Sequence, residues 1–174
     1  MRERERDAVL DYLVLADSTV LLGGLSEVRA VIDDRIDGVA ATHRAAIHKH
    51  PTGSAGGQRS WADYTMQLRQ YRNRSQGFWV ASTDPEAAHH SVTGTVACDG
   101  LRRAAVLTDG ATRMVDRFQL LDWDGLLELL ERSGPEGLIG RTRAAETSDP
   151  MGRRWPRSKR HDDATAVLCR FGEV

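Results

Sequence analysis

The sequence predicts an α+β fold in which antiparallel sheets pack with helices, within a single domain over residues 1–174. Two observations predict this class. At least three segments with strand character follow one another without the intervening helices that a doubly wound parallel sheet requires. In addition, a chain of 174 residues, of which 40% are hydrophobic and 28% charged, is long enough to form one compact core.

The N-terminal half alternates apolar, β-branched runs with short helical patterns. Glycine, proline and aspartate separate these segments, because they favour turns and helix caps. The segment 48–58 contains Pro51 and three glycines and is therefore predicted to be a loop. The predicted elements are two strands within 8–22 joined tightly at Ala16-Asp17-Ser18, a strand over 27–32, a helix from Asp33 or Asp34 to Ile47, a helix over 61–71, a short strand over 78–80, a brief helix from Asp84 and a strand over 91–97.

The C-terminal half opens with an apolar run from Arg103 that ends at Asp109-Gly110. This pattern predicts a buried strand that reaches the surface at an acidic residue. Helical periodicity follows, then a basic loop that contains proline, and finally a second apolar run. The predicted elements are helices over 111–118, 123–132 and 135–146, a loop over 150–160 and a closing strand over 166–171.

Charge and cysteine content restrict the possible partners and compartment. The net charge of −1 does not favour binding to nucleic acid or to a membrane surface, since such proteins usually show a basic excess. No apolar run approaches the roughly 20 residues of a membrane span, and the charged start lacks the apolar middle of a secretory signal. Cys98 and Cys169 lie in apolar stretches. We therefore expect a cytoplasmic protein with both thiols buried and reduced.

Two aspartates are candidate metal ligands. Asp109 ends one predicted strand, and Asp162 stands immediately before the last strand. If these strands are neighbours, the two carboxylates meet at one end of the sheet and repel each other unless a cation compensates their charge. Their oxygen atoms suit Mg²⁺ or Mn²⁺. The simpler interpretation is that Asp109-Gly110 forms an ordinary turn and that Asp162 and Asp163 cap another.

The other polar residues give weaker predictions. Arg157 and Arg160 belong to a basic segment directly before Asp162 and could contact a phosphorylated substrate, although a solvated basic loop is the simpler interpretation. The four tryptophans are expected in the core or at an interface. Five histidines lack recognisable zinc-ligand spacing and are expected on a solvated surface, namely His43, His48, His50, His89 and His90.

Three segments, in this order, resemble the 2C type of metal-dependent serine/threonine protein phosphatases. Residues 13–21 resemble the paired strands around that family's Gly-Asp-Ser step, with Ala16 in place of glycine. Residues 105–110 are similar to its apolar strand ending in Ser-Asp-Gly, with threonine for serine. Residues 162–168 are similar to its closing Asp-Asn-x-Thr segment, and residues 78–88 resemble a stretch of a bacterial subgroup. The resemblance covers nearly the whole chain.

The resemblance implies a sandwich of two antiparallel sheets flanked by helices, with metal bound at the ends of the strands. It implies that Asp109 and Asp162 are direct ligands of Mn²⁺ or Mg²⁺ and that Asp17 is a structural turn residue. The family uses two such ions to activate a water that attacks phosphorus, and no catalytic residue beyond the metal ligands is implied. The implied activity is hydrolysis of phosphoserine and phosphothreonine in proteins.

The sequence departs from the family pattern in its length before Asp17. The family's first half supplies a phosphate-binding arginine and an Asp-Gly pair that bridges both metals, but only sixteen residues precede Asp17 here. Asp37-Gly38 follows no long apolar strand and is rejected as a substitute. We therefore expect a partial sandwich that lacks the N-terminal strands and has an incomplete metal site. The alternatives are an inactive remnant that serves as a binding or regulatory module, and an unstable truncated product.

Overall fold

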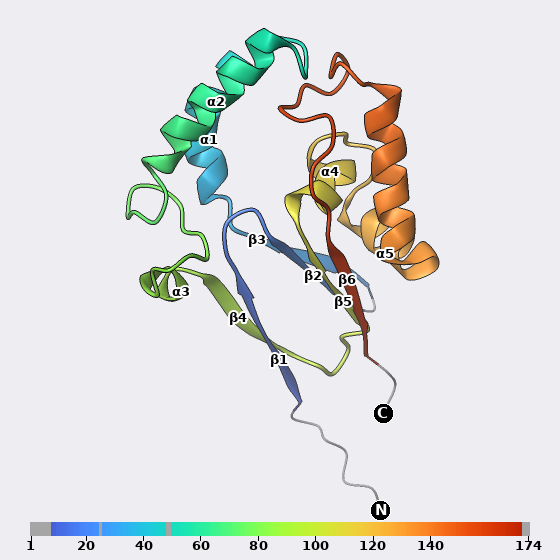
Figure 1. The fold of residues 1–174 in the computed structure, drawn as a ribbon. Helices are drawn as coiled ribbons and strands as arrows, with labels where there is room; N and C mark the ends of the chain where they lie inside the picture. Colours follow the sequence, from blue (N-terminus) through green and yellow to red (C-terminus); the bar gives the residue numbers. More distant parts are fainter. Residues whose placement is uncertain (1–7, 25, 48–49, 172–174) are drawn as a thin grey trace, which may run out of the picture.

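The computed structural model describes residues 8–24, 26–47 and 50–171, with side chains of residues 42–47 excepted. This part of the chain forms two antiparallel sheets and several helices (Figure 1), which confirms the predicted α+β class. The elements in chain order are β1 (Val9–Val14), β2 (Thr19–Gly23), β3 (Val28–Ile32), α1 (Arg35–Ile47), α2 (Ala55–Arg69), α3 (Glu86–His89), β4 (Val92–Ala97), β5 (Arg103–Leu107), α4 (Asp109–Asp116), α5 (Trp123–Ser148) and β6 (Ala166–Arg170).

The strands pair in two separate sheets. A four-stranded sheet has the order β3-β2-β5-β6, and a two-stranded sheet consists of β1 and β4. The expectation that the strands on either side of Ala16-Asp17-Ser18 pair with each other is therefore wrong. The turn instead leads from one sheet to the other, because stacking the sheets buries Val14 of β1 against Val20 and Leu22 of β2 in one apolar cluster.

Helices α4 and α5 cover the other face of the four-stranded sheet (Figure 1). Leu21 of β2 and Ala105 and Leu107 of β5 point to this side and are almost completely buried. They pack against leucines that recur along α5 at helical spacing, namely Leu126, Leu127, Leu130 and Leu138. The four-stranded sheet thus has apolar residues on both faces, which explains why every residue of β2 is buried.

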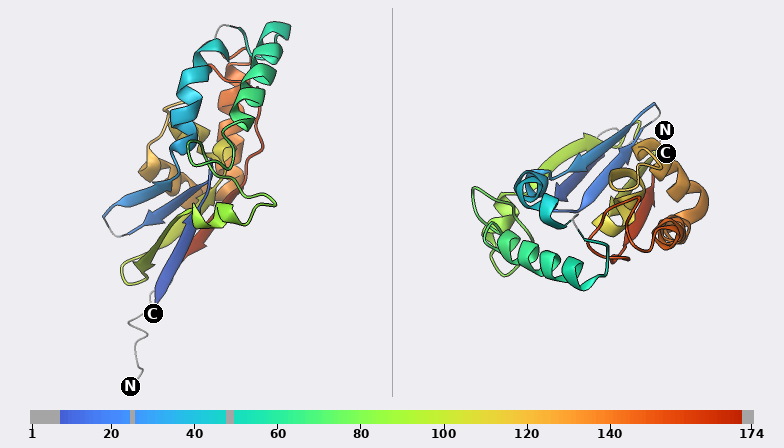
Figure 2. Two further views of the ribbon diagram at one scale, coloured as in Figure 1. Left: turned by 90° about the vertical axis from the view of Figure 1, so that its left-hand side faces the viewer. Right: turned by 90° about the horizontal axis from the view of Figure 1, so that it is seen from above.

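Helices α1 and α2 form a hairpin beyond one end of the strands, on the opposite side from α5 (Figures 1 and 2). The hairpin has its own small core, in which Tyr64 of α2 and Ala40 of α1 are buried and Trp61 and Leu68 are partly buried. Residues of the hairpin and of the strand ends line a common cleft.

Three boundaries differ from prediction. Helix α2 begins at Ala55, inside the predicted loop, because the Ser54 side chain accepts a hydrogen bond from Gly57 N (3.1 Å) and caps it. The predicted strand over 78–80 is reduced to one bridge between Arg72 and Phe78. The break predicted between the helices over 123–132 and 135–146 is confirmed, because Gly134 within α5 has non-helical backbone angles (φ 68°, ψ 177°), and only the end of the second helix differs, at Ser148.

The cysteines also differ from expectation. Cys98 is half-buried and Cys169 is exposed, so the prediction that both thiols are buried is wrong. Cys169 lies on the edge strand β6, in which three of the five residues are exposed to solvent.

Trp79 and Trp155 are buried as predicted. Within the described residues, no helix is both long and apolar enough to traverse a lipid bilayer.

Candidate functional site

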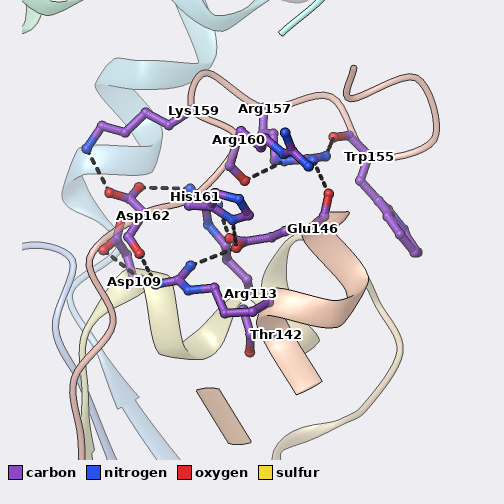
Figure 3. Close-up of polar contacts among 12 residues, drawn as sticks. Asp109, Arg113, Thr142, Glu146, Trp155, Arg157, Lys159, Arg160, His161 and Asp162 are labelled. Atoms are coloured by element: carbon purple, nitrogen blue, oxygen red, sulfur yellow. Dashed lines mark hydrogen bonds and ion pairs between the residues drawn. The ribbon is translucent and has the colours of Figure 1, made fainter. Parts of the chain in front are cut away.

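The paired ends of β5 and β6 bring Asp109 and Asp162 to the same end of the four-stranded sheet (Figure 3). Beyond the last strand pair, Thr108 and Thr165 continue the pairing: Thr108 N donates to Thr165 O (3.1 Å) and Thr165 N donates to Thr108 Oγ1 (3.0 Å). The chain then enters α4 at Asp109, while Asp162 lies in the segment that leads into β6. The two strands are therefore neighbours, as the metal hypothesis requires.

Gly110 allows these two segments to approach closely. A Cβ atom at this position would lie 2.1 Å from the Asp163 carbonyl oxygen, far inside any normal contact distance. A larger residue would have to push the start of α4 away from the segment that carries Asp162. The glycine of the Asp-Gly pair is thus required by the packing of two backbones, in addition to any role in a turn.

The electrostatic surroundings of Asp109 are unusual. Burial and the neighbouring carboxylates of Asp162 and Asp17 raise the pKa of Asp109 to about 6, although hydrogen bonding from Gly110 N and the charge of Arg113 oppose this rise. Its Oδ1 accepts a hydrogen bond from Gly110 N at 2.7 Å. The charges of Asp162 and Asp17 therefore oppose the ionisation of Asp109, and a cation would relieve this repulsion.

The β1–β2 turn brings Asp17 into this group. Ala16 has a φ of 54°, a left-handed conformation that is unfavourable for residues other than glycine. The turn is held by Asp33, which is 2% exposed and accepts a hydrogen bond from Ala16 N (3.2 Å). Burial would raise the pKa of Asp33, but hydrogen bonds from Arg35 and Ala16 outweigh it and keep that pKa low. The family resemblance implied only a structural turn role for Asp17.

Asp162 is paired with two cations in this structure. Arg113 Nη2 donates to Asp162 Oδ2 (2.8 Å), and Lys159 Nζ donates to Oδ1 (2.7 Å; Figure 3). Arg113 is one helical turn after Asp109 on α4, so both residues lie on the same face of that helix. This spacing is the one sequence signal that could have identified Arg113 as part of the site.

Glu146 of α5 organises the buried side of the site. Its side chain is 0% exposed, and its two oxygens contact Arg113 Nη1 (2.5 Å), Arg143 Nη1 (2.7 Å) and His161 Nδ1 (2.6 Å). Burial would raise the pKa of Glu146, but the hydrogen bonds from His161, Arg143 and Arg113 hold it below its ordinary value. Arg143 also donates to the Asp162 carbonyl. No local sequence pattern predicted this network, because its members come from α4, α5 and the loop before β6.

Arg157 is buried within the loop over 150–160. All five of its N–H groups have acceptors inside the protein: Asp149 Oδ2 and the carbonyl oxygens of Glu146, Asp149, Trp155 and Arg160. This geometry favours a structural role for Arg157, in which it stabilises the loop, rather than the predicted contact with a substrate. Arg160 is exposed and supplies its backbone carbonyl to Arg157.

A cleft of 970 Å³ lies between the α1–α2 hairpin and the strand ends. Asp109 and Asp162 line it, together with Asp17, Asp116 and Lys159. The hairpin contributes an aromatic and aliphatic wall that includes Trp61, Tyr64 and Leu68. The volume is at the upper end of the range of about 300–1,000 Å³ for small-molecule sites.

The donor set agrees with a hard divalent cation in its chemistry, since carboxylate oxygens suit Mg²⁺ and Mn²⁺. Residues 8–24, 26–47 and 50–171 contain no group of three or more His, Cys, Asp or Glu side chains placed to hold a metal ion. His50, His89 and His90 are exposed as predicted, and the ring of His90 stacks on Trp79 with 3.7 Å between centroids. The side chains of His43 and His48 lie outside the described residues.

Comparisons of this chain with protein-family models, with curated proteins and with solved structures found no match.

Proposed function

We propose that this chain is a domain of a divalent-metal-dependent phosphatase that hydrolyses phosphoserine and phosphothreonine in proteins. One observation carries this proposal: Asp109 and Asp162 lie at the adjoining ends of β5 and β6, and their mutual repulsion helps to raise the pKa of Asp109 to about 6. The order of motifs that resembles 2C-type phosphatases supports the same function.

Asp109 and Asp162 would hold Mn²⁺ or Mg²⁺ through carboxylate oxygens, and Asp17 is close enough to add negative charge to the site. A bound divalent cation would supply a nucleophilic water of lowered pKa and positive charge for the phosphoryl oxygens. The chain's own residues orient this site. Arg113 fixes one oxygen of Asp162, and Glu146 fixes Arg113 from the buried side.

The cleft is large enough that it would accommodate a phosphorylated side chain together with part of its peptide. Its acidic residues lie at the strand ends, whereas the α1–α2 hairpin offers apolar surface at Trp61 and Leu68. A phosphate directed toward the acidic end would place the flanking residues of the peptide against this hairpin.

The first test is metal binding, measured by calorimetry with Mn²⁺ on the whole chain, with hydrolysis of p-nitrophenyl phosphate followed in parallel. We expect Asp109→Ala to abolish Mn²⁺ binding and any Mn²⁺-dependent hydrolysis, because it removes a proposed ligand. Asp163→Asn removes an acidic charge next to Asp162 from an exposed side chain, and it should retain most of the binding. Wild-type protein that is folded but binds no Mn²⁺ would exclude the proposal.

A second candidate function is a non-catalytic module that binds a phosphorylated segment without metal. The pairing of both Asp162 oxygens with Arg113 and Lys159 favours it, since the charge of this carboxylate is already compensated. Titration of a phosphoserine peptide in the presence of a chelator separates the two functions: binding that needs no metal supports the module, and binding that requires Mn²⁺ supports the phosphatase.

A further inference from the structure

The two oxygens of Asp162 are held by cations of very different accessibility. The Arg113 side chain, on Oδ2, is 8% exposed, whereas the Lys159 side chain, on Oδ1, is 48% exposed. Figure 3 shows Lys159 approaching Asp162 from the side opposite the buried Glu146 network. One oxygen is therefore bound to a buried group, and the other to a group that is in contact with solvent.

The contact with Arg113 cannot be released without disrupting the interior. Arg113 Nη1 contacts Glu146, whose side chain is completely buried and also binds Arg143 and His161. Removing Arg113 from this network would leave a buried carboxylate with fewer partners, which is costly. Arg113 therefore acts as a permanent partner of Asp162 Oδ2.

Lys159, by contrast, can leave Asp162 by rotation of its side chain alone. The backbone around it is anchored, since Arg157 O accepts a hydrogen bond from Thr52 Oγ1 (2.8 Å) and Arg160 O accepts one from Arg157 Nε (3.2 Å). The lysine ammonium is a point charge on a flexible four-carbon stem. Its departure needs no movement of the loop.

We propose that Lys159 is a tethered cation that competes with a divalent metal ion for Asp162 Oδ1, and thereby sets the metal affinity of the site. This inference rests on the proposed function. The Lys159 ammonium also lies close enough to Asp109 and Asp163 to interact with their charges. A divalent cation held by Asp109 and Asp162 would replace the lysine charge at Oδ1, and Lys159 would then turn into solvent.

The inference is tested by Mn²⁺ calorimetry on the whole chain at pH 7.5 and constant salt. Lys159→Gln removes the competing charge and should tighten Mn²⁺ binding roughly fivefold, the size expected for loss of one partly exposed ion pair. Lys159→Arg keeps the charge and should stay near wild type. Arg153→Gln removes a positive charge from an exposed residue of the same loop and controls for the change in net charge.

The outcomes distinguish this inference from the proposed function. If wild type and Lys159→Gln both bind no Mn²⁺ while folded, the phosphatase proposal fails and this inference fails with it. If both bind Mn²⁺ with equal affinity, only the competing role of Lys159 is overturned. An equal gain in Arg153→Gln would also overturn it, because the effect would then be one of overall charge.

Discussion

Asp109 combines features that rarely occur in one surface carboxylate. It is partly buried, it begins α4, and two further aspartates act on it. The position at a helix N-terminus favours its ionised form, yet burial, Asp162 and Asp17 together favour the protonated form and prevail. A residue whose ionisation is disfavoured in the fold, but which lines a cleft, is a strong candidate for a functional role.

The raised pKa of Asp109 predicts a pH-dependent gain in stability for Asp109→Asn. Its pKa is about 6 in the folded protein and near its ordinary value of 3.8 in the unfolded chain, so its ionisation weakens the fold as pH rises through this range. Without metal at pH 7.5, the variant should melt about 2–4 °C above wild type. Near pH 3.5 the difference should largely disappear.

The measurement is thermal unfolding of both proteins across this pH range in a chelating buffer. A variant that melts at or below wild type at pH 7.5 would show that Asp109 is not destabilised by its ionisation. Addition of Mn²⁺ should reverse the order, since only wild type retains the proposed ligand.

Helix α5 shows how a single backbone conformation shapes an element. Gly134 has φ 68° and ψ 177°, which is outside the helical region and within a region essentially limited to glycine. Pro135 follows directly and begins the second part of the helix. The kink allows Leu130 before it and Leu138 after it both to be completely buried in one core.

Two glycines of α5 provide a matched test of the kink. An added Cβ at Gly134 or Gly140 would meet no described atom within 4 Å, so packing does not distinguish them. Gly134→Ala should lower the free energy of unfolding by about 1–3 kcal/mol because of its positive φ. Gly140→Ala should raise it by about 0.5–1 kcal/mol, because alanine is the better helix former. Urea denaturation measures both, and equal effects would contradict the kinked geometry.

The molecule as a whole is a stack of a two-stranded sheet, a four-stranded sheet and a helical layer, with the α1–α2 hairpin beside the strand ends (Figures 1 and 2). The two sheets share an apolar cluster that contains Val14, Val20 and Leu22. The outward face of β1 exposes Val9 and Leu13 by 56% and 54%. A two-stranded sheet is marginal alone, so its stability depends on this stacking.

Adjacent residues of β1 test the stacking. Val14 is 1% exposed and faces the four-stranded sheet, whereas Leu13 is mostly exposed on the other face. Val14→Ala should lower the free energy of unfolding by about 2 kcal/mol through lost burial. Leu13→Ala removes more atoms but should change it by no more than about 0.5 kcal/mol. If chemical denaturation shows the larger loss for Leu13→Ala, β1 faces the opposite way.

Local sequence signals predicted most of the elements. Apolar alternation and turn residues located β3, β4, β5 and β6 closely, because these signals depend only on neighbouring positions. The same reasoning missed the start of α2, since the Ser54 cap lies in a glycine-rich segment that reads as a loop. Asp109 and Asp162 were identified as candidates from their place at the ends of strands and from the family resemblance.

The tertiary structure alone decided how these elements combine. The separation of β1 from β2 depends on β1 pairing with β4, where Val14 lies opposite Val92, and no local pattern encodes a partner so distant in sequence. The same holds for the contacts of the buried Glu146 with Arg113 and His161, which are brought together only by packing. The sequence thus determined the elements and the two acidic strand ends, because these are local, while long-range burial decided the sheet order and the cations that pair with Asp162.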